Sequence, residues 1–171
     1  MIRKAFYFLL LATILGLWLF SDRLFPPEVV RAETATVRDG DTIVLNTVIY
    51  RLYGIDAPEY HQMCKDKDGR DWPCGKAARL QMAAMVAPGN IECEPQAEDR
   101  YNRKVARCGS ATVPDLAKAM VDAGLAISPA ERGTAAYAYE EDAAKAGKRG
   151  IWQGSFDTPA DWRVAHPRPT P

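Results

Sequence analysis

The stretch TATVRDGDTIVLNTVIYRLYGIDAPE, residues 34–59, decides the fold. It contains three short runs rich in β-branched and aromatic residues, at 34–38, 42–45 and 48–53, and turn residues separate them. Short runs of this composition between turn residues are typical of β-strands. We therefore expect the folded domain to begin with three consecutive strands.

The rest of the domain predicts two more strands and three helices. The order is helix, strand, strand, helix, helix, at residues 75–87, 91–94, 104–108, 114–124 and 135–146. The helices follow from apolar residues at one-face spacing and from proline and glycine at their ends. Five strands with a helix after the third favour an α+β fold. We predict a five-stranded OB-type Greek-key β-barrel with three helices, preceded by an N-terminal apolar helix.

The N-terminus predicts export. Arg3 and Lys4 precede 16 uncharged residues, 5–20. This run is longer than the core of many signal peptides and shorter than a full span of about 20 residues, so we interpret residues 1–23 as a signal anchor or a signal peptide. Basic residues before the run place the rest of the chain outside the cytoplasm. We expect a periplasmic or extracellular protein that touches a membrane only through this segment, anchored in the inner membrane by residues 5–20 if the segment is retained.

Composition divides residues 24–171 into three parts. Residues 24–32 contain two prolines and predict a linker, and residues 33–153 predict one domain, large enough to bury a core. Residues 154–171 are rich in proline and predict an irregular tail. We expect Trp162 in this tail to pack against the folded domain. We expect the chain to be a monomer.

Four cysteines predict two disulfides, because an even set in a small exported domain is typically oxidised. Cys93 and Cys108 lie in two strand-like stretches that flank a polar turn, so they can face each other across a hairpin. This leaves Cys64 with Cys74. The alternative is a zinc site made by His61, Cys64 and Cys74, although a fourth ligand and a C-x-x-C pair are absent from the sequence.

Charge excludes a broadly basic nucleic-acid-binding surface. The chain has 22 Lys and Arg residues against 22 Asp and Glu, a formal net charge of zero. A polyanion must therefore be bound by local arginines and a bound cation.

Five residues carry the chemistry: Asp41, Arg51, Asp56, Glu59 and Arg103. Carboxylates are the ligands that hard cations prefer, and a carboxylate can also take a proton from water. Guanidinium groups present forked donors that match a phosphate. This combination is what the cutting of a phosphodiester requires. A competing interpretation, that the carboxylates are merely solvated loop residues, does not explain why arginines accompany them at strand ends.

Four segments, 37–42, 51–59, 99–103 and 149–152, resemble the staphylococcal nuclease (thermonuclease) family in their order and separations. The resemblance covers roughly residues 33–153. It implies that a calcium ion is held by the carboxylates of Asp41 and Asp56 and by the backbone carbonyl of Ala57. It also implies that Glu59 is the general base or orients the attacking water.

The same resemblance implies that Arg51 and Arg103 grip the scissile phosphate and that Tyr101 lies near the nucleotide. The segment 127–133 departs from the family, which has a lysine and tyrosines there. Tyr137 and Tyr139 are expected to divide between core and surface and not to replace those tyrosines.

These observations predict an endonuclease that depends on calcium, does not discriminate between sugars, and hydrolyses phosphodiester bonds of DNA and RNA to 3′-phosphate products. The alternative is a non-catalytic OB-fold binding module for nucleic acid or for an extracellular polymer such as an exopolysaccharide. Glu59 together with both arginines favours the enzyme, because a binding module needs no base beside a metal site.

Overall fold

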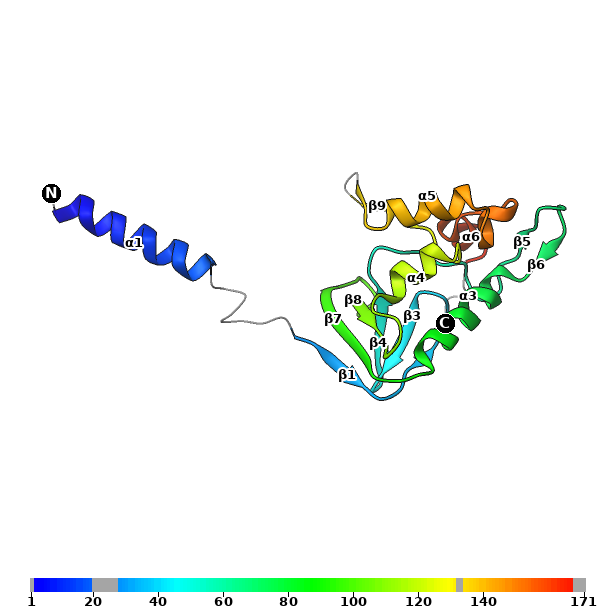
Figure 1. Cartoon of the computed structure of the whole chain (residues 1–171), viewed down its shortest axis with the longest axis horizontal. Helices are drawn as coiled ribbons and strands as arrows, with labels where there is room; N and C mark the ends of the chain where they lie inside the picture. The colour runs from blue at the N-terminus through cyan, green and yellow to red at the C-terminus, as the bar shows by residue number, and fades with distance from the viewer. Residues whose placement is uncertain (1, 20–27, 132–133, 168–171) are drawn as a thin grey trace.

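The computed structural model describes residues 2–19, 28–131 and 134–167 (Figure 1). Its main feature is a curled six-stranded sheet. The strands lie in the order β1 (Val30–Ala32), β7 (Ile91–Glu98), β8 (Lys104–Gly109), β4 (Val48–Leu52), β3 (Thr42–Leu45) and β2 (Thr36–Val37). The pairing of β4 with β8 is parallel, and the other pairings are antiparallel.

Two small hairpins and several helices complete the described chain. The hairpins are β5 (Cys64–Lys65) with β6 (Asp71–Trp72), and β9 (Ala130–Glu131) with β10 (Thr134–Ala135). The helices are α1 (Ile2–Leu19), α3 (Cys74–Val86), α4 (Leu116–Asp122), α5 (Ala138–Ala146), α6 (Pro159–Ala165) and the 3₁₀ helix η1 (Gly150–Gln153).

The two edge strands of the sheet are neighbours in sequence. β1 ends at Ala32 and β2 begins at Thr36, so four Cα–Cα steps, at most about 15 Å, join opposite edges of the sheet. In a flat sheet those edges would lie about 24 Å apart, because adjacent strands are spaced by about 4.8 Å. The sheet must therefore curl toward a barrel.

This architecture confirms an α+β fold but corrects the element count. The sheet has six strands and not five, because β1 adds a strand that pairs with β7 at the edge opposite β2. The three predicted domain helices correspond to α3, α4 and α5. α6 is a further helix, within the stretch predicted to be an irregular tail, and β1 starts inside the predicted linker.

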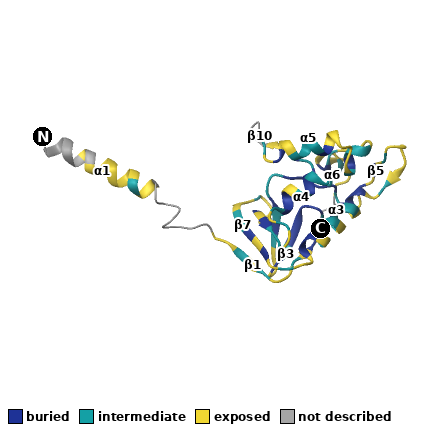
Figure 2. Ribbon diagram, viewed as in Figure 1, coloured by how far each residue is buried: buried dark blue, intermediate teal, exposed yellow. Residues whose placement is uncertain are grey.

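The core lies between the concave sheet and helices α3 and α4 (Figure 2). Ile43, Leu52, Met82 and Met120 are fully buried there. Burial of each such side chain stabilises the fold by roughly 1.5–3 kcal/mol. The alternating burial along β4 places Tyr50 and Leu52 toward the core and leaves Arg51 on the opposite face.

Both disulfides form with the predicted pairing, Cys64 with Cys74 and Cys93 with Cys108. Cys93 and Cys108 are directly opposite each other on β7 and β8. The zinc alternative is wrong, because both of its cysteines are oxidised and His61 is exposed to solvent.

The predicted export segment and linker lie partly outside the described residues, which omit 1 and 20–27. Helix α1 falls within the segment. Among the helices that the structure describes, none has both the length and the apolar character that crossing a membrane requires.

Candidate active site

Asp41 lies at the end of the turn that leads into β3, and its carboxylate is buried. It accepts hydrogen bonds from Thr42 Oγ1 (2.8 Å) and from the backbone N–H of Ala57 (3.2 Å). The turn passes so close to its neighbours that a Cβ on Gly40 would lie 2.7 Å from the Cβ of Ala57. Glycine at position 40 therefore allows Asp41 and the 54–59 loop to approach each other.

Arg51 joins the two carboxylates predicted to bind calcium. It pairs with Thr42 across β3 and β4, and its Nη1 lies 2.7 Å from Asp41 Oδ2 while its Nη2 lies 2.7 Å from Asp56 Oδ1. Burial lowers the pKa of Arg51, but the charges of Asp41 and Asp56 raise that pKa by more, so the guanidinium stays charged. Asp56 is held in place by two backbone hydrogen bonds of 2.9 Å to Ile127.

Glu59 follows the buried Pro58 and lies at the start of a turn closed by Gln62. The backbone N–H of Gln62 donates to the Glu59 carbonyl (2.8 Å), and the side-chain carbonyl of Gln62 accepts from the Glu59 N–H (3.2 Å). The backbone of Glu59 is thereby fixed on both sides, and its carboxylate is partly exposed.

A third arginine, Arg163 of α6, joins Asp56 to Glu59 and was not predicted from the sequence. Its two terminal nitrogens bind the two oxygens of Asp56 at 3.0 and 2.9 Å. Its Nη1 also donates to Glu59 Oε1 at 3.1 Å. These hydrogen bonds, first that to Asp56, raise the pKa of Arg163 further above its ordinary value.

Arg103 and Tyr101 form a separate group at the β7–β8 turn. Arg103 Nε and Nη2 both lie 2.7 Å from Asp99 Oδ2, and the Arg103 guanidinium lies 5.5 Å from the centre of the exposed Tyr101 ring. Arg51 is in register with Val105 on β8, so strand alternation places Arg103 on the same face of the sheet as Arg51. The structure thus puts both arginines on one face but gives no direct contact between Arg103 and the carboxylates.

Tyr137 and Tyr139 follow the segment that departs from the family resemblance. Tyr137 is buried, and its hydroxyl lies 3.1 Å from Asp115 Oδ2, whereas Tyr139 is 82% exposed. The expected division of these tyrosines between core and surface is confirmed.

The cluster has an excess of negative charge. Asp41, Asp56 and Glu59 are three carboxylates against the two guanidinium groups of Arg51 and Arg163. Asp39 lies beside Asp41, and burial together with the charge of Asp41 raises the pKa of Asp39 to about 7, so Asp39 adds only part of a negative charge near neutral pH. An added cation would reduce this excess.

Oxygen donors of this kind suit a hard cation such as calcium, which takes carboxylates, backbone carbonyls and water. Asp41, Asp56 and the Ala57 carbonyl fit that chemistry. Within residues 2–19, 28–131 and 134–167, however, no three His, Cys, Asp or Glu side chains are arranged to hold a metal ion. Arg163 instead occupies oxygens of Asp56 and Glu59.

The described structure combines a curled α+β sheet with a cluster of carboxylates that two arginines bridge. The chain belongs to the staphylococcal nuclease homologue family, whose model matches residues 49–154. It therefore contains a nuclease-like domain of this family. The match begins on β4 and includes Arg51, Asp56, Glu59 and Arg103, whereas Asp41 lies before it.

Two relatives are similar over most of this chain. The succinoglycan biosynthesis protein ExoI of Rhizobium meliloti (strain 1021) is 33% identical over 120 residues, which cover 70% of this chain and 63% of that protein. The probable endonuclease LCL3 of Zygosaccharomyces rouxii is 31% identical over 130 residues, which cover 70% of this chain and 46% of that protein. The chain therefore spans less than two thirds of the length of either relative.

Proposed function

We propose that this chain is a calcium-dependent, sugar-non-specific endonuclease that hydrolyses DNA and RNA to 3′-phosphate products. One observation carries the proposal: three carboxylates are linked through arginines. Arg51 joins Asp41 to Asp56, and the guanidinium of Arg163 joins Asp56 to Glu59. The family and the relative named as a probable endonuclease support hydrolysis of phosphodiesters.

The residues divide into a metal-binding set and a reacting set. Asp41, Asp56 and the carbonyl of Ala57 would hold calcium, which supplies electrostatic stabilisation of a phosphate when bound. Glu59 takes the proton of the attacking water. As the new P–O bond forms, the bond from phosphorus to the 5′ oxygen breaks, and that oxygen leaves as a hydroxyl after taking up a proton.

The two arginines stabilise the charge that develops on the phosphate. Arg51 lies beside the carboxylates, and Arg103 reaches the phosphate from the same face of the sheet after leaving Asp99. Planar guanidinium groups can donate two parallel hydrogen bonds to phosphate oxygens. In this proposal Tyr101, whose exposed ring lies next to Arg103, contacts the nucleotide.

The two disulfides support action outside the cytoplasm, because such bonds persist in oxidising compartments. In this proposal the monomeric enzyme works in the periplasm or outside the cell, and residues 5–20 serve as export signal or anchor.

A second candidate function rests on the relative from Rhizobium meliloti, whose name places it in succinoglycan biosynthesis. On this hypothesis the domain is a non-catalytic module that binds a polysaccharide or nucleic acid. The carboxylates and arginines would then have only a structural role.

Cleavage of single-stranded DNA and RNA by the full, oxidised chain distinguishes the two. The assay contains calcium or a chelator, and Glu59→Gln serves as the matched control because it keeps size and hydrogen bonding but accepts no proton. Calcium-dependent cleavage that this variant lacks supports the enzyme. Binding of calcium or succinoglycan by a folded protein that cuts neither substrate would support the binding module.

A further inference from the structure

Arg163 occupies two groups that the proposed reaction needs. It binds Asp56, one of the calcium ligands, through both carboxylate oxygens, and it binds Glu59 through Oε1. A two-pronged hydrogen bond of this kind is among the strongest that a carboxylate makes. An oxygen of Asp56 that accepts from a guanidinium has less electron density and less room for a metal ion.

The contact of Arg163 with Glu59 also hinders the role proposed for that residue. A general base must offer a lone pair to water, and its basicity falls when a cation binds the carboxylate. Arg163 is thus paired both with a proposed ligand and with the proposed base, which are contributed by opposite ends of the 56–59 loop.

Helix α6 is attached to the domain mainly at its start, so the contact of Arg163 can break without loss of the whole helix. Its start is held by the buried Pro159, by the Thr158 cap on Asp161, and by Asp157, whose carbonyl accepts from Gln62. Beyond Pro159, the described hydrogen bonds and ion pairs that reach the rest of the domain from residues 160–165 are those of Arg163. Val164, next to it, is 83% exposed.

We propose that Arg163 is an internal counter-ion that competes with a divalent cation for Asp56 and sets the cation affinity of the site. While it is bound there, it also pairs with Glu59. The inference takes the identity of the cation and the role of Glu59 from the proposed function. Calcium binding displaces Arg163 from Asp56 and Glu59, and α6 moves away with it. By thermodynamic linkage, each of the two cations weakens the binding of the other.

The first test is calcium titration by calorimetry, with the full oxidised chain. Arg163→Ala should bind calcium about 10- to 100-fold more tightly than the parent, since hydrogen bonds to a charged group contribute roughly 1.5–3 kcal/mol. Arg163→Lys, which keeps the charge but not the fork, should fall between the two. Val164→Ala, on the same helix, should match the parent and controls for changes in α6 itself.

The second test needs no variant. Hydrogen exchange of the amides in residues 160–165 of the parent protein should become faster on addition of saturating calcium, because α6 loses the contacts of Arg163. Calcium-independent exchange there, or an unchanged calcium affinity in Arg163→Ala, would overturn the inference.

These outcomes separate the inference from the proposed function. Tighter calcium binding by Arg163→Ala in a protein that cuts no nucleic acid would support the counter-ion and refute the nuclease. Calcium-dependent cleavage, with equal calcium affinity in parent and variant, would support the nuclease and refute the counter-ion. If Arg163→Ala instead lost cleavage at unchanged calcium affinity, Arg163 would be a phosphate-binding residue and the counter-ion idea would be wrong.

Discussion

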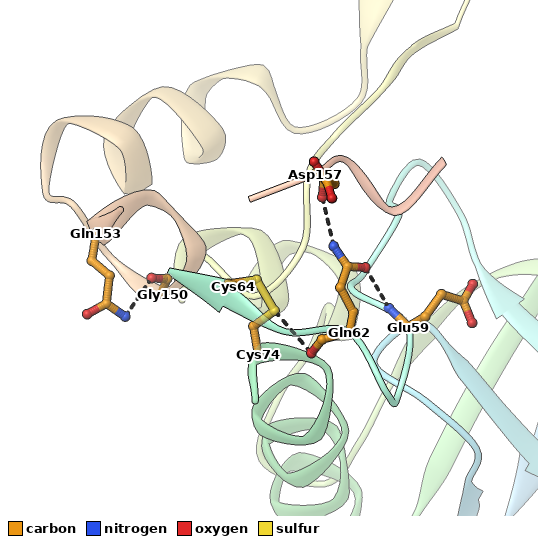
Figure 3. The surroundings of a disulfide bond; sticks show 7 residues. All are labelled: Glu59, Gln62, Cys64, Cys74, Gly150, Gln153 and Asp157. Atoms are coloured by element: carbon orange, nitrogen blue, oxygen red, sulfur yellow. Dashed lines mark hydrogen bonds between the residues drawn. A yellow bond between two sulfur atoms is a disulfide. The ribbon is translucent and has the colours of Figure 1, made fainter. Parts of the chain in front are cut away.

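Gln62 ties the loop of the proposed base to the C-terminal segment, because its side-chain N–H donates a 2.7 Å hydrogen bond to the backbone carbonyl of Asp157 (Figure 3). The same fully buried amide accepts from the backbone N–H of Glu59. One side chain therefore satisfies two main-chain groups that belong to segments far apart in the sequence.

Replacing Gln62 by Leu should destabilise the domain and misplace Glu59. Both main-chain groups would lose their partner, and the loss of each of these partly buried hydrogen bonds costs about 1 kcal/mol. We expect a loss of about 2 kcal/mol or more in urea unfolding, together with slower cleavage. Gln62→Glu keeps the acceptor for Glu59 and should retain more activity than Gln62→Leu; equal activity of the two would contradict this account.

Replacing Arg51 by Ala should leave Asp41 and Asp56 buried without their common cation. Removing one partner of a buried ion pair costs about 3 kcal/mol or more in unfolding free energy. Cleavage should fall about 10²- to 10³-fold, as it does when a transition-state donor is lost. Calcium should stabilise this variant more than the parent, because Asp41 loses its guanidinium partner and Asp56 keeps only Arg163, so that less positive charge competes with the ion.

Arg31→Ala is the matched control for that experiment. Arg31 forms an exposed pair with Glu92, and such surface pairs contribute about 0–1 kcal/mol. A loss of stability as large as that of Arg51→Ala would mean that charge alone, and not burial of the carboxylates, explains the effect.

The two disulfides should have separable effects. Removing either should lower stability by roughly 2–4 kcal/mol, because each closes a loop in the unfolded chain. Cys74 Sγ lies 3.4 Å from the Gln62 carbonyl, so loss of the Cys64–Cys74 bond should also slow cleavage per folded molecule (Figure 3). Serine pairs at 64 and 74 and at 93 and 108, compared at equal folded fraction, provide the measurement; the second pair should retain the parent rate.

Asp99 gives a pH dependence of known sign. Burial raises its pKa, but hydrogen bonds from Arg103 and Tyr101 lower it by more, so its pKa in the folded protein lies below its ordinary value. The ionised Asp99 therefore stabilises the folded protein at pH values above the ordinary pKa of about 4. This contribution is lost as the pH falls through the pKa of Asp99 in the folded protein. Asp99→Asn should be less stable than the parent near neutral pH, and the difference should shrink in acid; a difference that grows in acid would show the opposite shift.

Local sequence predicted the elements that depend on neighbours in the chain. β3 matches its predicted bounds because β-branched residues and flanking turns define it, and Asp56 and Glu59 were found because one short motif contains both. Arg163 was missed because its partners are 104 and 107 residues away. Thr158, Pro159 and Asp161 form a helix-start pattern that could have revealed α6, but not where it docks.

The N-terminal edge of the sheet was missed for a related reason. Val30–Ala32 follows two prolines and has no turn signal of its own, so its composition is that of a linker. It becomes a strand because it pairs with β7, which lies far along the chain. No local sequence pattern indicates this partner.

The short connection between β1 and β2 limits how far the two edges of the curled sheet can separate. Residues 33–35 hold these edges near each other, and β2 leads directly into the turn that carries Asp41. A longer connection would let the edges move apart and would shift Asp41 relative to the 54–59 loop without altering any reacting group. Insertions at residues 33–35 would therefore change the site without touching it.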